Sequence, residues 1–128
     1  MITIHPSLLN DELIIITIEG TIIYDKFKST NKRFYDNPSK YLLLDFRLTD
    51  LSFISQEQFH SLMDDIRLNA HKRPIGSKTA LLVSRDLEFG ISRMVQIYAE
   101  MHEIKIEFEI FKDYQDAMNW FKPPDIPV

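Results

Sequence analysis

The chain has 128 residues, of which 45% are hydrophobic and 27% charged, so its composition excludes disordered and collagen-like classes and its length fits one domain. A net charge of −4 argues against a nucleic-acid binder, because phosphate neutralisation requires clustered Lys and Arg. The absence of cysteine excludes disulfides, thiolate nucleophiles and Cys-based zinc sites.

The N-terminal part predicts a β-hairpin followed by a helix. Residues 2–4 are β-prone, residues 10–12 carry turn chemistry, and residues 13–18 are rich in β-branched side chains, with Gly20 closing the unit. Residues 24–35 place aromatic side chains at near-helical spacing, which predicts an amphipathic helix. Asn37 and Pro38 end that helix, since proline disfavours helix in the residue before it.

The central part predicts two buried strands with a helix between them. Residues 41–46 and 78–83 are apolar runs without alternation, which suits strands buried on both faces. Ser55 and Gln58 form a capping-box pattern, and the helix it opens extends to about Asn69. The predicted inward side of this helix consists of Phe59, Leu62, Met63, Ile66 and Ala70.

The C-terminal part predicts helix, strand and helix. Ser84 or Asp86 is expected to cap the first of these helices. Its predicted inward stripe consists of Leu87, Ile91, Met94, Val95, Tyr98 and Met101. Residues 104–110 alternate between apolar and charged side chains, which is typical of a strand with one solvent-exposed face. Asp113 is expected to cap the last helix, which ends before Pro123.

These elements predict an α/β fold, with a mixed, mostly parallel sheet of about five strands flanked by four helices and an N-terminal β-hairpin. Residues 1–122 are expected to form a single domain and residues 123–128 a short C-terminal tail. The start of the chain has no basic segment followed by a signal-type apolar run, and the longest apolar runs are too short to span a bilayer. We therefore expect a cytoplasmic protein, with peripheral membrane contact left open.

Candidate site residues cluster at the carboxyl ends of the parallel strands, where ligands collect in open α/β sheets. Asp45 and Arg47 follow one buried strand, and Ser84 follows the next. Asp45 ends an otherwise apolar run, so it either accepts backbone N–H bonds in the following loop or contacts a ligand, and the first interpretation is favoured.

The third predicted helix carries the other candidates. Gly90 lies in mid-helix, where glycine costs about 1 kcal/mol relative to alanine, so close approach of a neighbouring element or a ligand is expected there. Arg93 lies one turn further on, at the margin of the apolar stripe, and is expected to pair with Asp45 or Asp86, with a carbonyl, or with an anionic ligand. Phe89 and Met94 are its neighbours in the candidate site.

Other chemistries lack a signal in this sequence. The four histidines have no metal-binding spacing, and no nucleophile elbow or glycine-rich phosphate loop is present. We therefore expect no catalytic residue, no metal and no cofactor. The basic run 71–73 is interpreted as a solvated loop. Trp120 lies off the inward stripe of the last helix and is followed by an apolar tail. Together they suit a dimer contact or a membrane surface. The alternative is that the tail folds back or is disordered.

Two segments resemble the SpoIIAA-like, STAS/SEC14-type family of small bacterial domains. Residues 79–94 contain Gly90-x-x-Arg93-Met94, and residues 111–121 contain Ala117-x-x-Trp120. The acid after the third strand, Asp45, also matches. The resemblance implies a mixed sheet flanked by helices and no catalysis, with a small apolar ligand held between helices or contact with membranes.

The expected function is therefore a non-catalytic binding or regulatory module for a small apolar or lipid-like anionic ligand. The expected ligand-binding residues are Arg93, Gly90, Phe89, Asp45, Arg47, Ser84 and Met94. Arg93 or Arg47 would hold the anionic head. The expected cavity lining is Phe59, Met63, Phe89, Met94 and Met101.

Two alternatives remain open. The first is a protein-interaction module of the anti-sigma-factor-antagonist type, using the face around residues 45–56, with a protein partner or a second copy as a homodimer. The position that is phosphorylated in such antagonists corresponds most nearly to Gln56, which argues against a phosphorylation switch, although Ser52 and Ser55 lie close by. The second alternative is an enzyme in which acidic side chains such as Asp45, Asp86 and Glu88 meet.

Overall fold

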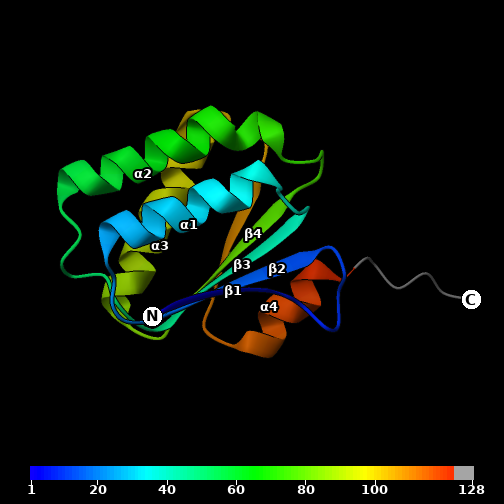
Figure 1. The fold of residues 1–128 in the computed structure, drawn as a ribbon, viewed down its shortest axis with the longest axis horizontal. Helices are drawn as coiled ribbons and strands as arrows, with labels where there is room; N and C mark the ends of the chain where they lie inside the picture. Colours follow the sequence, from blue (N-terminus) through cyan, green and yellow to red (C-terminus); the bar gives the residue numbers. More distant parts are fainter. Residues whose placement is uncertain (123–128) are drawn as a thin grey trace, which may run out of the picture.

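The computed structural model describes residues 1–122, which form one five-stranded sheet and four α-helices (Figure 1). The strands are β1 (Ile2–Pro6), β2 (Leu13–Thr21), β3 (Tyr41–Asp50), β4 (Lys78–Leu82) and β5 (Glu107–Phe111). The helices are α1 (Tyr24–Asp36), α2 (Gln56–Asn69), α3 (Asp86–Met101) and α4 (Tyr114–Phe121), with a short 3-10 helix, Ala70–Lys72, directly after α2. The predicted α/β class and the order of strands and helices are confirmed. The predicted tail, residues 123–128, lies outside the described residues.

The sheet has the order β1-β2-β3-β4-β5, with β1 antiparallel to β2 and every other neighbouring pair parallel. Successive residues of a strand point to opposite faces. One row across the sheet therefore consists of Ile4, Ile16, Leu44, Leu81 and Ile110, which are paired in register. All of these side chains belong to the larger hydrophobic core, which lies between this face and α1, α2 and α3.

The helices lie on two sides of the sheet. The chain crosses from β2 to β5 one strand at a time, and right-handed crossovers then place α1, α2 and α3 on the same face. Figure 1 shows α1 and α2 on one side of the strands and α4 on the other, with α2 farther from the strands than α1. No helix within residues 1–122 combines the length and the apolar character needed to cross a membrane.

A smaller core lies on the second face. It is formed by Leu13, Ile15, Leu43, Ala80 and Leu82 from the strands and by Ala117, Met118 and Phe121 from α4. Trp120 joins its edge: its ring lies 5.6 Å from that of Phe111, and the Lys78 ammonium lies 4.9 Å from its centroid. These contacts leave Trp120 half-buried at the edge of this core.

The orientation of α3 differs from the predicted stripe. Its buried side chains are Glu88, Ser92, Val95 and Ala99. Leu87, Met94 and Met101 are 46%, 51% and 75% exposed, so these three predicted core residues lie outside the core. The small side chains of Ser92 and Ala99 allow α3 to pack closely on the sheet, and the larger apolar side chains of Leu87, Met94 and Met101 are left partly exposed to solvent.

Helix capping follows the prediction at two helices and departs from it at a third. The capping box of Ser55 and Gln58 is present at α2, and the Asp113 carboxylate accepts from the Asp116 N–H at α4. At α3 the N-cap is Arg85, whose side chain makes no capping bond. The Ser84 hydroxyl donates instead to the Arg47 carbonyl at 2.7 Å, so neither Ser84 nor Asp86 caps this helix.

Candidate ligand-binding cavity

A cavity of about 330 Å³ lies beneath α2. Its lining comes from α1, α2 and α3 on the helical side and from β3, β4 and β5 below. Most lining side chains are aromatic or aliphatic, among them Phe27, Phe34, Leu44, Phe46, Phe59 and Met63. Leu62 and Met63 are the only buried side chains of α2. The helix therefore covers the cavity and does not pack tightly on the strands.

Polar contacts hold α2 on its two flanks. The Lys28 ammonium, on α1, donates to the Ser61 hydroxyl at 2.7 Å and lies 3.7 Å from the Asp65 carboxylate. On the other flank the Tyr98 hydroxyl, on α3, donates to the Asp64 carboxylate at 3.3 Å. Such exposed contacts contribute little to stability, so they position α2 without clamping it.

The cavity opens between the start of α2 and the middle of α3. Among its lining residues, Ser55, Gln56 and Met94 are exposed. Two further apolar side chains of this region, Phe53 before α2 and Leu87 on α3, are 71% and 46% exposed. We call this opening, defined by Ser55, Gln56 and Met94, the mouth.

A buried arginine lies at the far end of α2 from the mouth. Arg73 follows the short 3-10 helix, lines the cavity and is only 7% exposed. Its guanidinium donates to the Thr79 hydroxyl and, at 3.1 Å each, to the carbonyls of Lys40 and Lys78. The Phe34 ring lies 5.3 Å from its central carbon. These contacts fix the side chain at the beginning of β3 and β4.

The charge of Arg73 has no counterion within residues 1–122. No carboxylate there forms an ion pair with it, and its Nε atom has no hydrogen-bond acceptor. Burial lowers the pKa of the Arg73 guanidinium to about 10, so the group remains protonated at neutral pH. A buried charge without a partner is costly, which makes this position the one in the cavity where an anion would be stabilised most.

Three predicted site residues, Asp45, Arg47 and Ser84, come together outside the cavity. The Asp45 carboxylate accepts from the Arg47 backbone N–H at 3.1 Å and from its guanidinium at 3.0 and 2.9 Å. The Arg47 guanidinium also lies 5.5 Å from the Tyr114 ring, at the start of α4. The hydrogen bond with Asp45 raises the pKa of Arg47. Asp45 thus accepts a backbone N–H bond, as the favoured interpretation expected, but the donor is not in a following loop: β3 continues to Asp50, so Asp45 and Arg47 both lie within the strand and the prediction that Asp45 ends it is wrong.

Three of the predicted site residues on α3, Phe89, Gly90 and Arg93, are exposed and lie outside the cavity. Gly90 faces open space, with nothing within 4 Å of the position a Cβ would take, so the expected close approach is wrong. Arg93 is exposed and donates to the Gln96 amide oxygen at 2.8 Å; it pairs with neither predicted acid. The Phe89 ring is 40% exposed and lies 5.3 Å from the Lys112 ammonium.

The expected cavity lining is correct in part. Phe59, Met63 and Met94 line the cavity, as predicted. Phe89 and Met101 do not line it; their side chains are 40% and 75% exposed.

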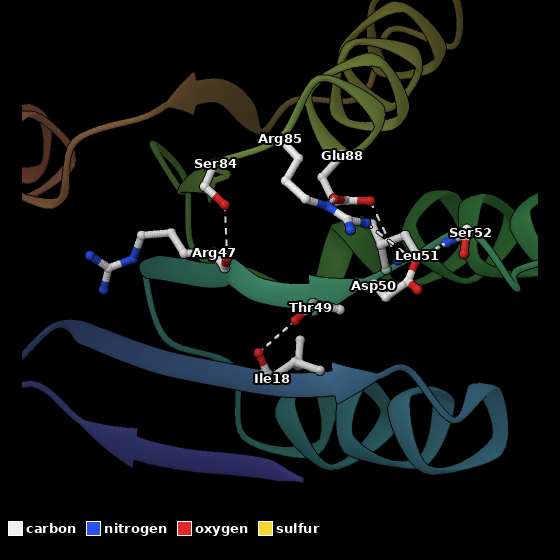
Figure 2. A network of polar contacts seen from close by, with 9 residues as sticks. All are labelled: Ile18, Arg47, Thr49, Asp50, Leu51, Ser52, Ser84, Arg85 and Glu88. Atoms are coloured by element: carbon white, nitrogen blue, oxygen red, sulfur yellow. Dashed lines mark hydrogen bonds and ion pairs between the residues drawn. The ribbon is translucent and has the colours of Figure 1, made fainter.

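A polar network occupies the carboxyl edge of β3 and β4 (Figure 2). The fully buried Glu88 carboxylate accepts from the Arg85 guanidinium and, at 3.4 Å, from the Leu51 N–H. Arg85 also pairs with Asp50 at 3.2 Å, and the Ser52 N–H donates to Asp50 at 2.9 Å. Hydrogen bonds from Ser52 lower the pKa of Asp50. The network connects the start of α3 to the loop before α2. Both of its carboxylates, Asp50 and Glu88, accept hydrogen bonds from Arg85 and from backbone N–H groups.

Figure 2 shows the Arg47 side chain pointing away from this network, so the two polar groups at the edge of the sheet are distinct. Within the part of the chain that the structure describes, no three His, Asp or Glu side chains are grouped so that they could hold a metal ion.

Sequence reasoning missed Arg73, which it assigned to a solvated basic loop. His71 and Lys72 are exposed as expected, whereas Arg73 is buried. The signal that could have identified it is Thr79, the polar residue of the next buried strand, which shares a face with Leu81 and accepts from Arg73.

Comparison with protein-family models, with curated proteins and with solved structures found no match to this chain. The resemblance to the SpoIIAA-like family therefore stays a prediction.

Proposed function

We propose that this protein is a non-catalytic binding module that holds a small apolar or lipid-like ligand in the cavity beneath α2. The observation that carries the proposal is the cavity itself, whose 330 Å³ fall within the range of about 300–1,000 Å³ typical of small-molecule sites. An apolar cavity of roughly 150 Å³ is large enough to hold benzene. The space here therefore suits a ligand with about twelve heavy atoms.

The lining supports an apolar ligand of adaptable shape. Phe59 and Met63 face the cavity from α2, and Met94 lies at the mouth. Methionine side chains are flexible and polarisable, so they fit ligands of different outline. The mouth gives such a ligand access without unfolding of the core.

A non-catalytic role agrees with the state of the acidic groups. Asp45, Asp50 and Glu88 are each bound by an arginine or a backbone N–H, which leaves none of them free to act on a substrate from the sheet edge. The mixed sheet flanked by helices is also the arrangement that the resemblance to SpoIIAA-like domains implies.

Thermal unfolding with a neutral probe, 1-decanol, tests the proposal. A ligand present at 100 times its dissociation constant stabilises a protein by about 2.7 kcal/mol, which raises the Tm of a domain of this size by on the order of 10 °C. Native mass spectrometry should then show one bound probe per chain.

Two tryptophan variants on α3 locate the binding. Ile91→Trp fills the cavity and should abolish the Tm increase. Met101→Trp, at a site that is 75% exposed and outside the cavity, should preserve it. If decanol leaves the Tm of the wild-type protein unchanged, or if both variants respond as the wild type does, the cavity is not a binding site.

A further inference from the structure

We infer that the cavity is specific for a medium-chain carboxylate, which enters with its carboxylate first, places it at Arg73 and leaves its hydrocarbon chain toward the mouth. The inference rests on the proposed function and deepens it, because it names the chemical class of the ligand and its direction in the cavity.

The first support is the set of hydrogen-bond donors at the Arg73 end. The Arg73 Nε–H has no acceptor among residues 1–122. The Thr79 hydroxyl accepts from Arg73, and its own hydrogen is left to donate. Arg73 and Thr79, which both line the cavity and contact each other, therefore offer one positive charge and hydrogen-bond donors to a small anion.

The second support is the neighbourhood of that charge. The partners of Arg73 are a hydroxyl and two carbonyls, which satisfy part of its donor set and supply no negative charge. Lys40 and Lys78 contribute only their carbonyls, because their ammonium groups lie over the rings of Tyr41 and Trp120. One uncompensated positive charge matches a monoanion, so a carboxylate fits better than a phosphate monoester, which carries nearly two charges.

The third support is the division of the cavity along its length. Thr79 lies at the beginning of β4, where it pairs with Leu42 of β3 and accepts from the Arg73 guanidinium. Farther along β3 the lining continues through Leu44 and Phe46, toward the mouth at the start of α2. Charge at one end and apolar surface along the rest is the pattern of an amphiphile bound with its head inward.

Titration calorimetry with a matched ligand series tests the chemical class. The series is decanoate, 1-decanol, decylamine and decyl phosphate, which share a chain and differ in the head. Decanoate should bind roughly tenfold or more tightly than decanol, as expected for a charge-assisted hydrogen bond, and decylamine should not bind measurably. Equal affinity for decanol and decanoate would overturn the role of Arg73 while leaving the proposed function intact. Tighter binding of decyl phosphate would overturn the assignment to a carboxylate.

Variants of Arg73 and Arg93 test whether Arg73 binds the carboxylate. Arg73→Met keeps an apolar stem of similar length and should reduce the affinity for decanoate to that for decanol. Arg73→Lys should restore part of the preference. Arg93→Met, at an exposed site outside the cavity, is the control and should leave both affinities unchanged. If Arg73→Met retains the preference for decanoate, the inference is wrong; if that variant does not fold, the ligand series on the wild-type protein still decides.

A crystal structure with 10-bromodecanoate tests the direction. The anomalous signal of bromine should lie near Gln56 and Met94, and the carboxylate should lie within hydrogen-bonding distance of Arg73. Bromine beside Arg73 would reverse the orientation and refute the inference.

Discussion

Replacing Glu88 by glutamine tests whether the network in Figure 2 stabilises the fold. The side chain is fully buried at the start of α3 and accepts from Arg85 and from the Leu51 N–H. Glutamine keeps the shape and can still accept one hydrogen bond, but it removes the negative charge opposite Arg85. The substitution therefore isolates the charge from the packing.

The expected loss follows from the exposure of the partner. A hydrogen bond between charged groups contributes about 1.5–3 kcal/mol. The Arg85 side chain is 53% exposed, so solvent screens the pair and the lower part of that range applies. The bond from Leu51 is long, at 3.4 Å, and glutamine can retain it. We expect Glu88→Gln to lower the free energy of unfolding by about 1.5–2 kcal/mol.

Urea unfolding measures this loss. With a slope of about 1–3 kcal/mol per molar urea, the midpoint should fall by roughly 1 M. Glu100→Gln, an exposed change on the same helix, is the control and should shift the midpoint little. A double-mutant cycle with Arg85→Gln should give a coupling energy of about 1 kcal/mol. A loss below about 0.5 kcal/mol, or no coupling to Arg85, would refute the reasoning.

Three further outcomes are expected. Gly90→Ala should raise the free energy of unfolding by about 1 kcal/mol in urea titration, because an added Cβ meets nothing within 4 Å; destabilisation would reveal a contact at this site. The pKa of Asp50 in the folded protein is lowered from 3.8, so its contribution to stability is present above that value and is lost as the pH falls through the folded pKa. Asp50→Asn should therefore weaken the dependence of the free energy of unfolding on pH in the acidic range. An unchanged pH dependence in that range would contradict this. Lys28→Met removes the contacts with Ser61 and Asp65, so hydrogen exchange in α2 should accelerate while exchange in α4 stays the same; equal exchange in α2 would show that these contacts do not hold the helix.

The elements were predictable where the determining interactions are local. The capping box of Ser55 and Gln58 spans one helical turn, and the cap of Asp113 acts on a residue three positions away. The rotation of α3 was not predictable in this way. Hydrophobic periodicity favours the stripe through Leu87, Met94 and Met101, but the face that packs is chosen by the sheet and carries smaller side chains and Glu88.

The candidate site was predictable only in its apolar part. Phe59, Met63 and Met94 follow from helical spacing on α2 and α3. The burial of Arg73 depends on the Lys40 carbonyl, 33 residues earlier in the chain, and no local pattern encodes such a contact. Asp45 attracted attention as an acid ending a buried strand, yet it is neutralised two residues later by Arg47.

The unbroken strand order determines on which face of the sheet each helix lies, and so where the cavity forms. In open α/β sheets, the usual crevice forms where neighbouring strands send their connections to opposite faces. Here the connections after β2, β3 and β4 run over the same face, and within residues 1–122 only the chain that leaves β5 turns to the other face, toward α4. The cavity lies away from the edge where such a crevice would form, beneath α2, and its helical lining comes from α1, α2 and α3. Under the proposed function the ligand enters the hydrophobic core itself, so the same side chains would set both the folding stability and the affinity for the ligand.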